Sequence, residues 1–264
     1  MRQFKQEGLV YYKFDSFDDL ALDHAIFSRI GGNSQGPYSS MNLGGTNGDN
    51  PKAVVANHEK LFQVFGRPYS SRFDVWQVHG KTILFSDAPR PPEKKHPPAD
   101  GIFTDKPEVT LIMRFADCVP IFLVDPKRRV YGLAHAGWQG TVKRTAASLV
   151  DRFVCEYGSH PAELVACIGP SIGPDHYEIG PDVIKQVQAT FGGSADNLLL
   201  TSNGDSPGSK VEFDLWQANC LVLEQAGVKQ VEVAGICTAC NVDDWYSHRA
   251  EAGRTGRFGA LIGL

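Results

Sequence analysis

Short runs of β-branched and aromatic residues, separated by glycine, proline and polar clusters, predict strands along much of the chain. The runs cover 10–14, 73–78, 81–85, 109–114, 120–124, 130–134, 163–168 and 231–234, with a further apparent strand over 24–28. Most of them lie in the first two thirds of the chain, and they do not alternate regularly with helical segments.

Apolar residues recur at helical spacing in other parts of the chain. The segment 51–65 carries the clearest signals, because Asn50 can cap its first turn, Pro51 occupies the first helical position and Gly66 follows its end. Similar spacing predicts further helices over 141–157, 214–225 and 181–190.

These elements predict an α+β fold in which helices pack on a mixed sheet or sandwich, because the strands cluster without the regular alternation of α/β proteins. Loop-like composition is confined to 87–98 and 192–209, and neither stretch separates regions of different composition. We therefore expect a single domain over residues 1–264.

The composition is that of a globular protein, with 42% hydrophobic and 21% charged residues. The 26 Lys and Arg against 30 Asp and Glu leave a net charge of −4, so the basic excess typical of nucleic-acid or anionic-membrane binding is missing. Apolar runs such as 119–124 are far shorter than the roughly 18 residues of a membrane-spanning helix. Because no apolar targeting segment follows Met1, we expect a cytoplasmic protein without nucleic-acid, membrane or obligate protein partners.

Three predicted strands end in, or lead into, a turn that carries a metal-ligand side chain. His79, Cys118 and His135 stand at these positions, and loops at one end of a sheet are common places for functional sites. Two imidazoles and one thiolate form a known catalytic zinc set with a fourth position left open. On spacing alone, the alternative is that these are ordinary buried histidines and a core thiol.

A second cysteine motif, Cys237-Thr238-Ala239-Cys240, lies near the end of the chain. With the later His248, it has the spacing of half a structural zinc site or of a redox pair. The sequence shows no two further ligands for it, so we expect incidental thiols that contribute neither to metal content nor to turnover.

Two regions carry arginines suited to an anion. The glycine-rich segment 29–40 matches neither a Walker A nor a dinucleotide fingerprint. Arg29 and the backbone N–H groups of this segment can still hold an anion; the alternative is that the segment is an exposed turn. Arg249, with Arg254 and Arg257, makes a local positive patch, which is typical of a phosphate site or of a solvated tail.

Taken together, these segments closely resemble the YfiH/YlmD-like family, and most of all its Bacillus-type YlmD branch. That family was once labelled as laccase-domain or multicopper polyphenol oxidases and is now described as purine nucleoside phosphorylases. The matching motifs occur in the family's order over about residues 25–258 and include Phe27-Ser28-Arg29, Gln77-Val78-His79-Gly80, Ala99-Asp100-Gly101, Ala116-Asp117-Cys118-Val119-Pro120, His135-Ala136-Gly137-Trp138, Gly169-Pro170-Ser171-Ile172 and Tyr246-Ser247-His248-Arg249.

The resemblance implies that His79, Cys118 and His135 bind one Zn²⁺ per chain, and that the fold has four layers, α/β/β/α. It also implies substrates: adenosine, inosine, guanosine and S-methyl-5'-thioadenosine cleaved with phosphate, and adenosine deaminated to inosine. The chain departs from the family where Gln139 and Ala250 replace frequent arginines, which bears on anion binding.

For deamination, the implied zinc lowers the pKa of a bound water, which then attacks C6 of adenine. Asp117, adjacent to Cys118, or Asp100 is the expected proton shuttle. For phosphorolysis, Arg29 and Arg249 are the expected phosphate contacts, and an aromatic residue, Trp138 or Tyr38, is suited to stack on the purine or to pack in the core.

Three other functions stay open from the sequence. A copper-dependent polyphenol oxidase (laccase-like) needs more histidine ligands than the eight present, although Cu²⁺ can substitute in a zinc site. A Cys–His hydrolase would use Cys118 as nucleophile and His135 as base. A zinc-dependent binding module without catalysis is the third.

Overall fold

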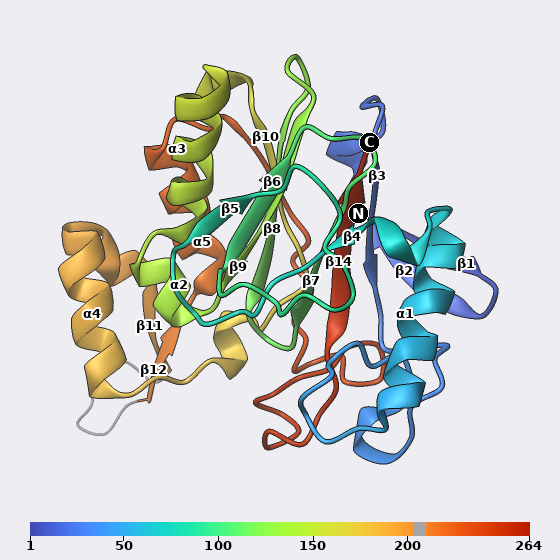
Figure 1. Ribbon diagram of the computed structural model, residues 1–264. Coiled ribbons are helices and arrows are strands. Elements are labelled where there is room, and N and C mark those ends of the chain that lie inside the picture. The colour runs from blue at the N-terminus through green and yellow to red at the C-terminus, as the bar shows by residue number, and fades with distance from the viewer. Residues whose placement is uncertain (203–209) are drawn as a thin grey trace.

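Two mixed β-sheets packed face to face form the centre of the computed structural model, which describes residues 1–202 and 210–264 (Figure 1). Within these residues the first sheet has the strand order β1-β2-β3-β14-β7-β4. Its strands are β1 (Arg2–Gln6), β2 (Leu9–Lys13), β3 (Asp23–Phe27), β14 (Phe258–Gly263), β7 (Thr110–Phe115) and β4 (Arg72–Phe73).

The second sheet has the order β13-β10-β8-β9-β6-β5 and is antiparallel at its centre. Its strands are β13 (Gln230–Val233), β10 (Val165–Ile168), β8 (Val119–Asp125), β9 (Val130–Ala136), β6 (Gly101–Thr104) and β5 (Ile83–Phe85). A small hairpin of β11 (Leu199–Ser202) and β12 (Lys210–Phe213) lies apart from both sheets.

Helices cover the outer face of each sheet, which gives the α/β/β/α layers (Figure 1). On the first sheet lies α1 (Pro51–Phe65). The second sheet is covered by α3 (Thr145–Tyr157) and α5 (Leu215–Gln225), with α2 (Trp138–Val142) and α4 (Pro181–Phe191) beside them. No helix in the described part is long and apolar enough to cross a membrane.

The central strands are buried on both faces, which explains why β8 is apolar almost throughout. Side chains alternate along a strand, so Ile121 and Leu123 pack against the helices while Phe122 and Val124 pack between the sheets. A strand covered on both sides needs an apolar residue at nearly every position.

The predicted α+β class and the sandwich are confirmed, and so is the helix over 51–65. Asn50 caps it by accepting the backbone N–H of Lys52 at 3.0 Å, and Gly66 ends it at a φ of +77°. The predicted helix over 141–157 is instead two helices, because Arg144 adopts a left-handed φ of +61° between them. In the predicted loop 192–209, residues 203–209 lie outside the described part, and β11 occupies its centre.

The structure also has strands that the pattern missed. β14 runs between β3 and β7 at the middle of the first sheet, although its glycines obscured the strand pattern. A Cβ at Gly259 would lie 2.4 Å from Cδ1 of Leu43, so close packing requires glycine there. The predicted strand 73–78 shortens to Arg72–Phe73, since the chain leaves the sheet to form the turn that carries His79.

Candidate functional site

His79, Cys118 and His135 meet at one end of the second sheet, as their spacing predicted. Their ligand atoms all lie within 4.8 Å of one another, and Sγ of Cys118 is 3.8 Å from Nε2 of His79. The ring centroids of the two histidines are 4.9 Å apart. Cys118 precedes β8 and His135 belongs to β9, and these strands pair directly.

Burial decreases across this trio from His135, which is buried, through Cys118 to the exposed His79. Two imidazole nitrogens and a thiolate are ligands that zinc prefers, and three of them leave a fourth tetrahedral position open. The residues present therefore fit a catalytic zinc ion that is reached from one side.

Asp100 is the buried carboxylate behind the trio. Its Oδ1 lies 2.9 Å from Nδ1 of His135, and its two oxygens accept backbone N–H groups from Val78, His79 and Gly80 at 2.6 to 3.1 Å. Burial raises the pKa of Asp100, but His135 and the Gly80 N–H outweigh it and lower the pKa overall. Such a carboxylate directs the other ring nitrogen of a ligand histidine toward the metal.

This geometry corrects one expectation. Asp100 is fully buried, is engaged by several donors and does not line the cavity beside the trio, so it is a positioning residue rather than a proton shuttle. It orients His135 and, through the turn of backbone N–H groups, His79 as well.

When no metal is bound, His135 stabilises a negative charge on Cys118, and Cys118 stabilises a positive charge on His135. Burial opposes charge on both, but the neighbouring histidines lower the pKa of Cys118 to about 6. In the same way, the Cys118 thiolate and the Asp100 carboxylate raise the pKa of His135 to about 9. A thiolate is therefore present at neutral pH, and a metal ion that binds here must displace the proton of His135.

Close packing around the thiolate depends on Gly137. A Cβ at this position would lie 2.7 Å from Sγ of Cys118 and 3.5 Å from Cδ2 of His79. Since the φ of Gly137 is −74°, glycine is needed there for space and not for an unusual backbone conformation.

The trio lies on the wall of a cavity of about 690 Å³, a size suited to a small-molecule ligand. Aromatic side chains from different segments form part of its lining, namely Trp76, Trp138 and Tyr177. Trp76 is 49% exposed, which is unusual for so large an apolar side chain and consistent with a stacking surface.

Three arginines line the same cavity and differ in their partners. Arg114 is held by Asp74 at 3.1 Å. Arg249 donates to the carbonyl of Glu178 at 3.0 Å and lies over the Tyr177 ring, and Arg257 donates to nearby carbonyls. Within residues 1–202 and 210–264, neither Arg249 nor Arg257 has a carboxylate partner, so both are available to an anion.

Asp117 is the acidic residue that lines this cavity in the described part of the chain. Its Oδ1 accepts the hydroxyl of Thr238 at 2.7 Å, and its Oδ2 accepts the backbone N–H of Arg249 at 2.6 Å. Its φ of +79° turns the chain sharply just before Cys118. Asp117 thus links the metal-ligand turn to the segment that carries Arg249.

Arg29 does not reach the cavity, contrary to the expected phosphate contact. Its guanidinium forms an ion pair with Glu251 at 3.1 Å, donates to the carbonyls of Ser39 and Val242, and lies over the Tyr246 ring. All of these contacts join Arg29 to neighbouring segments of the fold, so its role is structural. Arg29 lines a separate shallow depression that also includes Ala250.

Of the two aromatic candidates, Trp138 lines the cavity and Tyr38 does not. The hydroxyl of Tyr38 donates to the carbonyl of Asn47 at 2.6 Å, a structural bond. Gln139, one of the two departures from the family pattern, lines the cavity and accepts from Lys143. Lys143 also donates to the carbonyl of His79 at 2.7 Å.

Sequence reasoning missed Arg257 and Trp76 as cavity residues. Arg257 belonged to the positive patch, but only the folded chain distinguishes it from Arg254, which does not line the cavity. For Trp76 the single signal was its nearness to His79 in the sequence.

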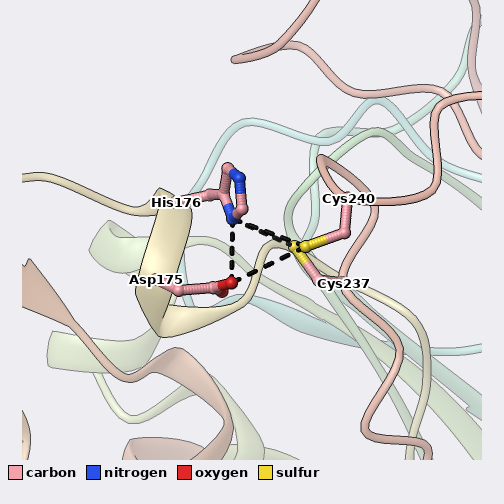
Figure 2. A group of neighbouring side chains, drawn as sticks. All are labelled: Asp175, His176, Cys237 and Cys240. Atoms are coloured by element: carbon pink, nitrogen blue, oxygen red, sulfur yellow. Dashed lines mark hydrogen bonds and ion pairs between the residues drawn. The ribbon is translucent and has the colours of Figure 1, made fainter.

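The Cys237–Cys240 pair does have further ligands beside it, so the expectation that it lacks them is wrong. Asp175 and His176 lie next to the two cysteines, with all four ligand atoms within 4.8 Å of one another (Figure 2). His248 is not part of this group; it lines the main cavity.

The comparisons with known proteins agree with this architecture. A protein-family model described as "Multi-copper polyphenol oxidoreductase laccase" matches residues 23–264. A "Purine nucleoside phosphorylase" of Deinococcus radiodurans is 37% identical over 246 residues, which is 93% of this chain and 90% of that protein. "Purine nucleoside phosphorylase YlmD" of Bacillus subtilis is 35% identical over 245 residues, or 90% of this chain and 86% of the other.

Solved structures share the fold over nearly the whole chain. The crystal structure of YlmD from Geobacillus stearothermophilus matches with a TM-score of 0.91 at 31% identity, covering 99% of this chain and 97% of that one. A Bacillus licheniformis hypothetical protein YfiH matches with a TM-score of 0.90 at 30% identity, covering 98% and 97%.

Proposed function

The chain belongs to the family described as multi-copper polyphenol oxidoreductase laccase, and its relatives YlmD and YfiH are named purine nucleoside phosphorylases. We propose that this chain is a zinc-dependent purine nucleoside phosphorylase. Its substrates are adenosine, inosine, guanosine and S-methyl-5'-thioadenosine, which it cleaves with phosphate, and it also deaminates adenosine. The observation that carries the proposal is the ligand trio on the wall of a cavity that also holds two arginines, neither of which pairs with a carboxylate in the described part of the chain.

His79, Cys118 and His135 are the residues that hold the zinc ion. When bound, zinc supplies a Lewis acid that lowers the pKa of nearby water and polarises substrate oxygen atoms. Asp100 keeps His135 in the required orientation, and Gly137 leaves room beside the thiolate.

Arg249 and Arg257 are the residues that bind the phosphate. Charge-assisted hydrogen bonds from guanidinium groups to phosphate are strong and directional, and these two side chains have no competing carboxylate in the described residues. The purine stacks on an aromatic wall of the cavity, for which Trp138 and Trp76 are suited because they lie there beside the trio.

In phosphorolysis, a phosphate oxygen forms a bond to C1' of the ribose as the bond from C1' to N9 of the purine breaks. The departing base takes up the proton that hydrogen phosphate loses, and the products are free purine and ribose 1-phosphate, or its methylthio derivative from S-methyl-5'-thioadenosine. The two arginines hold the phosphate in position, so that the attack takes place within one bound complex.

In deamination, water adds to C6 of adenosine and ammonia leaves, which gives inosine. Asp117 is our candidate for the proton transfers, since it is the carboxylate on the cavity wall next to Cys118. It accepts a proton from the attacking water and returns it to the departing amine.

A Cys–His hydrolase is the second candidate, because one observation favours it. Cys118 has a lowered pKa beside His135, and Asp100 orients that histidine, an arrangement like that of cysteine nucleophiles with a base. Chelation distinguishes the two. If Cys118 binds zinc, removing the metal should greatly accelerate its alkylation; if it is a free nucleophile, the rate should not change.

A copper oxidase is less well supported by the chain. In the described residues, the candidate metal ligands form two separate groups, one of three residues and one of four that includes Asp175, whereas a multicopper oxidase needs a three-copper cluster as well as a blue copper site. Cu²⁺ can nevertheless occupy the trio in place of zinc, because it binds such ligands more tightly.

Product analysis tests the proposal. Zinc-loaded protein is incubated with adenosine or inosine, with and without phosphate, and the purines, nucleosides and sugar phosphates are separated by chromatography. Free base and ribose 1-phosphate should form only with phosphate, while adenosine should yield inosine in both cases. Base release without phosphate would indicate a nucleoside hydrolase, and no nucleoside turnover at all would contradict the proposal.

A further inference from the structure

A four-residue cluster lies outside the main cavity, where two segments far apart in the sequence meet. Asp175 and His176 come from the 3-10 turn Pro174–His176, and Cys237 and Cys240 come from the loop after β13. Figure 2 shows the four side chains pointing toward one another from these two segments.

The distances between these ligand atoms are close to those of a tetrahedral metal site. Nδ1 of His176 is 3.9 Å from Sγ of Cys237 and 3.5 Å from Sγ of Cys240. Oδ2 of Asp175 is 3.6 Å from Sγ of Cys240 and 3.1 Å from Nδ1 of His176. Ligands at about 2.3 Å (sulfur) and 2.0–2.2 Å (nitrogen, oxygen) from one zinc ion would be about 3.4–3.8 Å apart.

The surroundings of Cys237 also suit a thiolate. The backbone N–H of Gly173 donates to its sulfur at 3.2 Å, and a hydrogen bond of this kind stabilises the negative charge. A Cβ at Gly173 would lie 3.1 Å from Cβ of Cys237 and 2.8 Å from Oδ1 of Asp175, so glycine gives both residues the space they occupy.

We propose that Asp175, His176, Cys237 and Cys240 bind a second zinc ion in a closed, structural site. Two thiolates exclude the hard cations Mg²⁺ and Ca²⁺, which take oxygen ligands, and a mixed set of two sulfurs, one nitrogen and one oxygen fits tetrahedral zinc. All four positions are filled by side chains, so this ion has no open position for a substrate, in contrast to the ion of the trio.

The second ion would stabilise the wall of the main cavity by joining two segments that contribute to it. Thr238, between the two cysteines, donates to Asp117 at 2.7 Å. On the other side, Tyr177 directly follows His176, lines the cavity and lies under the guanidinium of Arg249. A zinc ion joining the two segments would therefore fix Asp117 and Tyr177 relative to each other, while taking no part in the reaction itself.

Zinc stoichiometry of the full chain tests the site without using activity. The purified protein is stripped with a chelator under reducing conditions, reloaded with zinc, freed of excess metal and measured by elemental analysis. Wild type should hold two zinc ions per chain, and Cys118→Ala and Cys240→Ser one each. Cys155→Ser, which changes an exposed cysteine on α3, should still hold two.

The results that overturn the proposal are equally distinct. A single zinc ion in wild type that is lost in Cys118→Ala and kept in Cys240→Ser would show that the second cluster does not bind metal. A Cys237–Cys240 disulfide in the protein as isolated, detected by mass spectrometry without reductant, together with failure to take up a second zinc ion after reduction, would also overturn it.

Cobalt substitution gives a second measurement in case the cysteine variant folds poorly. The thiolate-to-cobalt absorption should fall to about two thirds in Cys118→Ala, because two of three coordinating sulfurs remain.

His176→Gln, a change at a half-exposed side chain, should lose one metal equivalent and keep the circular dichroism spectrum of wild type. Retention of two equivalents by His176→Gln would contradict the proposed ligand set. Because these readouts count metal, they stand or fall independently of the proposed phosphorylase activity.

Discussion

Oδ1 of Asp100 lies 2.9 Å from Nδ1 of His135, and the same carboxylate accepts three backbone N–H groups from the turn that carries His79. One buried side chain therefore orients two of the three residues that we propose as metal ligands. Its role is positional: it determines which nitrogen of His135 faces the other two side chains of the trio and where the His79 turn lies.

Replacing this carboxylate should weaken metal binding at the trio. In Asp100→Asn, an amide N–H group would face the backbone N–H groups, which leaves buried donors unpaired. We expect zinc affinity to fall by about 10–100-fold and the free energy of unfolding by about 1–3 kcal/mol. Competition with a chromophoric chelator and thermal denaturation measure the two effects.

Asp87→Asn is the matched control for that variant, since Asp87 is an exposed carboxylate and should leave both quantities unchanged. Wild-type zinc affinity in Asp100→Asn would mean that Asp100 does not orient the ligands.

Replacing either cavity arginine should slow phosphorolysis, which consumes phosphate, much more than deamination, which consumes water. Arg257→Met and Arg249→Met should each lose a charge-assisted contact of about 1.5–3 kcal/mol, which lowers phosphorolysis by about 10–150-fold and deamination much less. The KM for phosphate and the ratio of the two rates are the measurements. Arg249→Met keeps the backbone N–H that Asp117 accepts, so the cavity wall is preserved.

Arg29→Met supplies the contrast. Because Arg29 pairs with Glu251 away from the cavity, this variant should be less stable, with the ratio of phosphorolysis to deamination unaltered. An unchanged KM for phosphate in both cavity variants, or a selective loss of phosphorolysis in Arg29→Met, would reverse the assignment.

The sequence allowed the trio to be predicted because each ligand stands beside a strand end, and strand ends of one sheet converge. It misled about Arg29, since nothing local reveals that Glu251, 222 positions further along, would neutralise it. A conspicuous arginine in a glycine-rich loop is equally suited to an anion or to a distant carboxylate.

The second cluster was beyond sequence reasoning for a similar reason. The partners of the Cys237–Cys240 motif come from a turn 61 to 65 residues earlier, and only the pairing of β10 with β13 brings that turn beside the loop. The α+β class, in contrast, follows from features that local patterns carry, namely clustered apolar strands and amphipathic helices, whereas the four layers were implied only by the family resemblance.

Zinc binding at the trio should strengthen with pH in a defined window. Between about 6, the pKa of Cys118, and about 9, the pKa of His135, Cys118 is a thiolate and His135 carries a proton in the metal-free site. Binding displaces that proton, so affinity should rise about tenfold per pH unit in this range and more steeply below pH 6, where the thiol is protonated as well.

The protection of Cys118 from alkylation by added zinc, followed by mass spectrometry of the Cys118 peptide, reports this affinity for the trio alone. An affinity that stays constant from pH 6 to 9 would contradict the thiolate and imidazolium charges assigned to the metal-free site.

Gly137→Ala should disrupt the metal site through space alone. Its Cβ would lie 2.7 Å from Sγ of Cys118, so the thiolate must move and zinc should be lost from the trio. Gly193→Ala is the control, because a Cβ there meets no heavy atom within 4 Å. Elemental analysis compares the two, and full zinc content in Gly137→Ala would show that the turn tolerates the added methyl group.

The central claim is that the trio is the phosphorolysis site, and the rate of ribose 1-phosphate formation from inosine tests it most directly. Wild type, Cys118→Ala and Cys155→Ala are compared after zinc loading and at saturating phosphate. Since loss of the ion removes several kcal/mol of transition-state stabilisation, Cys118→Ala should be slower by at least about 1,000-fold, and Cys155→Ala should match wild type. A Cys118→Ala variant that forms ribose 1-phosphate at the wild-type rate would contradict the account.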